Sequence, residues 1–225
     1  MLQARKFLLI ALLLSVPALV FAFVGVVCTY AGWQEVVLES NGRRVANMGW
    51  KGVQISRSNR VEDVDFDDGV YLAGGGGVSL LPIKNDGEFL VAQSVACWVL
   101  TMCVTLVLLS VVVCTCCCRG CCGGCLHRQR KPEAARPLAA AAMWLSLLCC
   151  ALSVAAVIVS DRMGKRAATE FRSTYLFPFK SKPEFEWILT LVASVLFATS
   201  AVLCWKATHV MKQQASLPAS SNSAA

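Results

Sequence analysis

Four long apolar blocks separated by polar segments dominate the pattern of the chain. They cover residues 7–27, 91–118, 138–160 and 187–205, and none of them contains Asp, Glu, Lys, Arg or His. A bilayer core about 30 Å thick requires roughly 20 apolar residues of helix. A spanning segment must pair its backbone polar groups internally, so blocks of this length without strand-like alternation predict four transmembrane helices.

The predicted fold is therefore an all-α transmembrane four-helix bundle, with a small β-rich outer segment between spans 1 and 2. The polar segments and the blocks alternate along the chain. The expected order is a cytosolic N-terminus (1–6), span 1 (7–29), a first outer segment (30–88), span 2 (91–118), a cytosolic Cys/basic loop (119–136), span 3 (138–160), a second outer segment (161–186), span 4 (187–205) and a disordered cytosolic tail (206–225).

The first outer segment has the pattern of short strands separated by turns. Its β-branched runs are residues 34–39, 52–56, 69–72 and 78–81. Asn41-Gly42 between extended stretches predicts a hairpin. The segment contains no cysteine for a disulfide, so the helices or a partner must stabilise the expected sheet.

The first block also resembles a signal peptide. Arg5 and Lys6 precede it, and Val20-Phe21-Ala22 could be a cleavage site. However, the apolar run continues to Val27, whereas the core of a signal peptide is usually about 7–15 residues long. A retained first span is the favoured interpretation, and cleavage remains the alternative.

Composition narrows the class of protein. Of the 225 residues, 56% are hydrophobic and 16% are charged, and the mean hydropathy is +0.60. Soluble domains average about 25% charged residues, so these values argue against a water-soluble enzyme, a disordered chain and a small disulfide-rich module.

Charge distribution predicts the orientation. The 119–136 loop carries five Lys/Arg and one acidic residue, whereas residues 30–88 carry six basic and nine acidic residues. Because cytosolic loops are enriched in Lys and Arg, both termini are expected in the cytosol. The 161–186 segment, with six basic and four acidic residues, discriminates less well.

Seven of the thirteen cysteines cluster at the expected cytosolic end of span 2. They are Cys114, Cys116, Cys117, Cys118, Cys121, Cys122 and Cys125. Juxtamembrane cysteines beside basic residues are typical of S-palmitoylation, which makes these seven the candidate lipidation sites. A zinc site and simple packing of small apolar side chains are the alternatives.

Basic residues follow the cysteines and are candidate contacts for anionic lipid of the inner leaflet. They are Arg119, Arg128, Arg130 and Lys131. Each such cation near an anionic surface contributes about 1 kcal/mol of attraction.

Alternating carboxylates at Asp63, Asp65 and Asp67 are a candidate weak cation site. The pattern lacks the bidentate glutamate of a calcium-binding loop, so a solvated acidic turn before a strand is the preferred interpretation.

Motifs of enzymes and transporters are missing from the sequence. It has no P-loop, GxSxG or HExxH, and the apolar blocks lack the ionisable residues that pumps carry at membrane depth. We therefore expect no catalytic residue, cofactor, metal or nucleic-acid partner. The expected partners are the bilayer and other membrane proteins, or a second copy of the chain.

The layout resembles the claudin-like tetraspan group, including the amastin surface proteins. The similarity lies in the four spans, the long first outer segment, Trp33 and Met48-Gly49-Trp50; the two cysteines of the claudin signature are not present. The resemblance implies the topology and transfers no functional residue. The expected function is that of a non-enzymatic protein that acts by lateral association or scaffolding in a membrane subdomain. The plasma membrane is the expected location, and an endomembrane or organelle membrane is the alternative. The alternative function is a channel or an auxiliary channel or transporter subunit.

Overall fold

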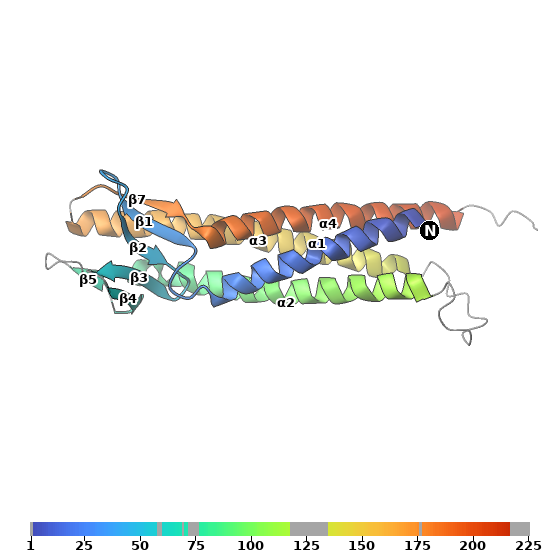
Figure 1. Cartoon of the computed structure of the whole chain (residues 1–225), viewed down its shortest axis with the longest axis horizontal. Coiled ribbons are helices and arrows are strands. Elements are labelled where there is room, and N and C mark those ends of the chain that lie inside the picture. Colours follow the sequence, from blue (N-terminus) through green and yellow to red (C-terminus); the bar gives the residue numbers. More distant parts are fainter. Residues whose placement is uncertain are drawn as a thin grey trace, which may run out of the picture. The chain divides into compact units, whose positions relative to one another are not determined.

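The computed structural model describes residues 2–57, 60–68, 70–71, 77–117, 135–175 and 177–216. These residues are mostly helical, with four long apolar helices and a small antiparallel sheet (Figure 1). The helices are α1 (Leu2–Val27), α2 (Leu81–Cys117), α3 (Ala135–Tyr175) and α4 (Phe185–Ser216). The strands are β1 (Gln34–Leu38), β2 (Arg44–Met48), β3 (Gly52–Arg57), β4 (Arg60–Asp65), β5 (Val70–Tyr71), β6 (Gly77–Val78) and β7 (Phe179–Pro183).

The chain divides into two compact units, and each helix contributes a segment to both. Unit 1 comprises Met1–Ala18, Leu100–Cys150 and Val195–Ala225. Unit 2 comprises Leu19–Val99 and Ala151–Ser194, and it contains both sheets.

Unit 1 is built only from helix segments, which pack through small and apolar side chains. Leu8, Leu108 and Phe197 are among its buried residues. The hydroxyl of Thr105 on α2 donates a hydrogen bond to Ser15 Oγ on α1, at 3.1 Å. The Ser15 hydroxyl in turn donates to the backbone oxygen of Leu12 in its own helix, at 2.8 Å.

The larger sheet of unit 2 has the strand order β4-β3-β2-β1-β7, and every neighbouring pair is antiparallel. Strands β5 and β6 form a separate two-stranded sheet. The predicted hairpin at Asn41-Gly42 is confirmed: it joins β1 to β2, and Gly42 has the positive φ of 67° that favours glycine.

The structure corrects one expectation for the outer segments and adds detail to the second segment. Asp63 and Asp65 lie within β4, so the acidic stretch is not only a turn that precedes a strand. Within the expected second outer segment, α3 continues to Tyr175, and β7 pairs along the whole length of β1.

The polar end of α3 supports the sheet because its apolar side chains recur at helical spacing. Met163, Ala167 and Phe171 are fully buried and belong to one core cluster with Val36 of β1. The ring of Phe171 also packs against Phe179 of β7, with 5.7 Å between the ring centroids. Strands β1, β2 and β7 accordingly lie across this end of α3 (Figure 1).

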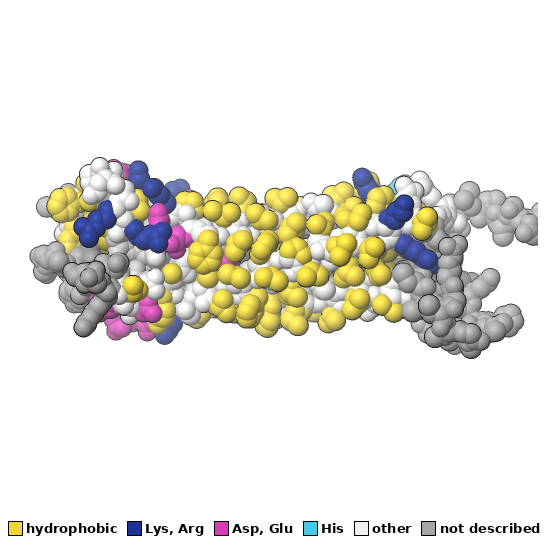
Figure 2. All heavy atoms as spheres, viewed as in Figure 1, with side chains coloured by type: hydrophobic (Ala, Val, Ile, Leu, Met, Phe, Trp, Pro, Cys, Tyr) yellow, Lys and Arg dark blue, Asp and Glu magenta, His cyan; other side chains and the backbone are white. Residues whose placement is uncertain are grey.

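Apolar side chains remain exposed along all four helices. Examples are Leu13, Leu106, Ile158 and Val195, each about 60% exposed. Figure 2 shows such side chains over the helices, whereas charged side chains gather at both ends of the view. In the described part of the chain, four helices are long and apolar enough to cross a membrane, consistent with a multi-pass membrane protein.

Candidate functional site

The three acidic residues of the candidate cation site have separate partners in unit 2. Asp63 Oδ1 accepts a hydrogen bond from Gln54 at 3.2 Å, and Asp67 pairs with Lys84 Nζ at 2.9 Å. The described residues contain no group of three or more His, Cys, Asp or Glu side chains that could hold a metal ion. The structure therefore does not bring these carboxylates together around one point.

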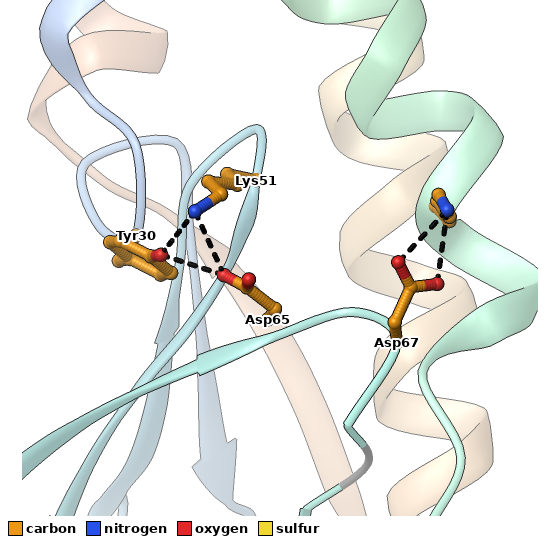
Figure 3. Close-up of polar contacts among 5 residues, drawn as sticks. Tyr30, Lys51, Asp65 and Asp67 are labelled. Atoms are coloured by element: carbon orange, nitrogen blue, oxygen red, sulfur yellow. Dashed lines mark hydrogen bonds and ion pairs between the residues drawn. The ribbon is translucent and has the colours of Figure 1, made fainter.

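Asp65 belongs to a polar cluster with Tyr30 and Lys51 (Figure 3). The Tyr30 hydroxyl donates to Asp65 Oδ1 at 2.6 Å, and Lys51 Nζ donates to the Tyr30 hydroxyl oxygen at 2.9 Å. The hydrogen bond from Tyr30, with a smaller effect of Lys51, lowers the pKa of Asp65, and hydrogen bonds to Tyr30 and Asp65 raise the pKa of Lys51. The cluster ties the segment after α1 to β4 and the turn before β3.

The lipidation candidates are only partly described. Cys114, Cys116 and Cys117 end α2, and their side chains are outside the description. The remaining candidates, Cys118, Cys121, Cys122 and Cys125, lie outside the described residues together with Arg119, Arg128, Arg130 and Lys131. Acylation and lipid contact at these residues stay predictions.

A hollow of about 250 Å³ lies beside strands β2, β3 and β4. Its lining residues are Arg44, Val45, Ala46, Asn47, Gln54 and Val61. The side-chain oxygen of Asn47 is buried without a hydrogen-bond partner. Val61 of the edge strand β4 also lines the hollow and is 65% exposed. The hollow therefore exposes an apolar side chain at the edge of the sheet.

A buried carboxylate among the helices is the feature that the sequence analysis missed. Glu186 lies in the first turn of α4, directly before the apolar block that begins at Trp187, and it is only 1% exposed. Its Oε1 accepts a hydrogen bond from the Thr190 hydroxyl one turn later, at 3.1 Å. A Cβ atom on Gly25 of α1 would lie 2.7 Å from the same oxygen, so alanine there would displace the Glu186 side chain.

Glu186 lines a small cavity inside unit 2. The other polar side chains of its wall are Trp33, Gln93, Ser94, Cys97, Ser153 and Thr190. The space open to water-sized molecules is about 20 Å³, which is enough for one water. Polar side chains from α2, α3 and α4 and from the segment before β1 therefore line the same cavity.

The segment before α4 carries a second carboxylate, Glu184, which has more hydrogen-bond and ion-pair partners than Glu186. Glu184 Oε2 accepts the backbone N–H of Gly32 at 2.7 Å, and Oε1 lies 3.4 Å from a guanidinium nitrogen of Arg44. Burial raises the pKa of Glu184, against the opposing effects of Gly32 and Arg44. Burial, followed by the charges of Glu186 and Glu184, also raises the pKa of the nearby Cys28 thiol to about 12. This thiol is therefore a packing group rather than a nucleophile.

Neither comparison with known proteins adds a family to these observations: no protein-family model matches the chain, and no curated protein matches it.

Proposed function

We propose that the protein is a non-enzymatic four-span integral membrane protein that acts by lateral association with other membrane proteins. In this proposal the helices cross the bilayer as a bundle, and the five-stranded sheet is the recognition surface. The candidate cysteines, once palmitoylated, would place the cytosolic loop at the inner leaflet. The same proposal includes a relationship to the claudin-like tetraspan group and its amastin members.

The sheet is the observation that carries the proposal. It combines strands from both outer segments, is anchored on α3 by Phe171 and Phe179, and has β4 as one of its two edge strands. An edge strand presents backbone N–H and C=O groups, and proteins use such edges to add a partner's strand. The exposed Val61 lies on this edge strand.

Photo-crosslinking in intact membranes tests this role. A photoreactive amino acid at position 62, on β4, is expected to form adducts with membrane proteins or with a second copy. Val61→Lys should abolish the adducts because a charge on an edge strand opposes strand addition. Asn41→Lys, in the turn between β1 and β2, is the matched control and should leave them unchanged. Failure to form adducts, or equal adducts in both variants, would contradict the proposal.

A channel or auxiliary transporter subunit is the second candidate, and the buried Glu186 favours it. Ionisable residues buried among helices commonly mark ion or proton pathways in membrane proteins. Conductance of liposomes that contain only this protein would support the channel, particularly if Glu186→Gln changed it. Sealed liposomes without conductance would leave the association role as the better account.

A further inference from the structure

Three buried polar atoms without hydrogen-bond partners belong to side chains that line the same cavity in unit 2. They are Trp33 Nε1, Gln93 Oε1 and Glu186 Oε2. The side chains are 1%, 6% and 1% exposed, respectively. Buried polar atoms are nearly always paired in folded proteins, with ordered water as the partner when no protein group is near. Three such atoms at one cavity therefore indicate a bound ligand.

The chemistry of the three atoms specifies that ligand. The indole N–H of Trp33 can only donate, and the amide oxygen of Gln93 can only accept. A water molecule can accept the first bond and donate the second, and it still has a hydrogen or a lone pair for Glu186. The cavity volume of about 20 Å³ also exceeds the 10–15 Å³ or so that one water requires. A metal cation fits less well because the indole donor in the wall would repel it.

The charge of Glu186 needs compensation that the protein does not supply at the cavity. None of the residues that line the cavity is basic; the other titratable side chain of its wall is Cys97 on α2, and the charges of Glu186 and Glu184 act on Cys28 after α1. The wall residues from α3, Leu152, Ser153 and Ala156, add no titratable group. An unpaired buried carboxylate is strongly unfavourable, and the uptake of a proton removes its charge.

We propose that this cavity is a proton-binding site, in which Glu186 takes up one proton from solvent and one bound water connects it to Trp33 and Gln93. In the protonated form, the Glu186 hydroxyl and the Trp33 N–H both donate to the water, and the water donates to Gln93 Oε1. When the proton returns to solvent, the water donates to the carboxylate instead. The site holds α4 to α2 and to the segment that leads into β1, and it is independent of the association role proposed above.

Infrared spectroscopy of the purified full chain in detergent micelles tests the proton. At pH 7, a carbonyl band of a protonated carboxylic acid is expected, which shifts in D₂O and is lost in Glu186→Gln. Glu184→Gln is the matched control, two residues away on the same segment, and the Glu186-dependent band should persist in it. A spectrum at pH 7 in which no acid band depends on Glu186 would overturn the proposal. If Glu186→Gln does not fold, Thr190→Val should shift the frequency of the same band because it removes the bond to Oε1.

Radiolytic hydroxyl labelling with mass spectrometry tests the water. Trp33 is expected to be oxidised despite its burial, because a bound water supplies the radical, whereas Phe171, which is 0% exposed in the same unit, should not be. Ser153→Val, which fills the wall of the cavity, should abolish the labelling of Trp33. Trp33 that is labelled no more than Phe171 would show that the cavity is dry and would overturn the water-linked site.

Discussion

Replacement of Gly49 by alanine should open the sheet of unit 2. Gly49 lies in the turn between β2 and β3, and a Cβ atom at this position would meet the backbone carbonyl of Thr29 far inside the 3.0 Å that real Cβ atoms keep. Backbone cannot rotate away as a side chain can, so the turn and the segment after α1 must separate. The same Thr29 oxygen accepts the Lys51 N–H at 2.9 Å, and this hydrogen bond is expected to break.

The loss in free energy of unfolding follows from the clash and from the broken hydrogen bond. Overpacking a close contact costs about 1–3 kcal/mol, and a lost backbone hydrogen bond adds about 1 kcal/mol. The expected destabilisation is therefore about 2–4 kcal/mol, which corresponds to an increase of about 30-fold to 700-fold in the population of the opened sheet.

Chymotrypsin cleavage of the full chain in liposomes measures this population. Trp33 and Phe66 are 1% and 3% exposed, so cleavage after either residue requires opening, and its rate follows the open population when reclosing is fast. Glu39→Ala, at an exposed position beside the first hairpin, is the control and should change the rate less than about threefold. A rate for Gly49→Ala within threefold of the wild type would refute the clash argument.

Three further outcomes are expected. Residues 30–88 expressed alone should show no cooperative thermal unfolding, because they lack β7 and the buried face of α3; a sharp transition by circular dichroism would contradict this. Tyr30→Phe should destabilise the sheet at pH 7. In a cleavage assay, the difference between this variant and the wild type should shrink as the pH falls below 3.8, because the pKa of Asp65 is lowered in the folded state and the stability that ionised Asp65 contributes is lost at lower pH. A difference that does not depend on pH would refute this role of Asp65. Hydroxylamine-dependent mass tags on protein from its native membrane should disappear when the seven cysteines within 114–125 are replaced by Ser, and an absence of tags in the wild type would remove the acylation hypothesis.

The helices could be predicted from sequence because block length and composition determine whether a segment can span a bilayer. Their ends could not, because the helices continue beyond the apolar blocks. α2 begins at Leu81, where the polar turn packs Ile83 into the core and Asp86 pairs with Arg166 at 2.8 Å. The continuation of α3 did leave a signal, the four-residue spacing of Met163, Ala167 and Phe171, which mixed charge obscured.

The strands that the sequence analysis missed are the polar ones. Strand β4 carries Glu62, Asp63 and Asp65, residues of low strand propensity, and β7 reads Phe-Lys-Ser-Lys-Pro. Both are edge strands, where pairing on one side and solvent on the other leave little hydrophobic pattern to detect.

Glu186 escaped notice for a different reason. A boundary drawn at Trp187 assigned its charge to the outer segment, and only tertiary packing reveals that the side chain points among the helices. No local pattern in the sequence distinguishes a carboxylate in the first turn of a helix that faces solvent from one that faces a cavity.

The pairing of β7 with β1 sets an order of assembly during synthesis. The two strands are separated by α2, α3 and five other strands, so the ribosome has produced β1 long before β7 exists. Until residue 183 has emerged, β1 has its backbone groups free on the side that β7 later occupies, and a nascent chain in this state offers an unpaired strand to any neighbour. A chain truncated before β7 would keep α1, α2 and α3 but lack α4, and its unpaired β1 would remain open to chaperones or to aggregation.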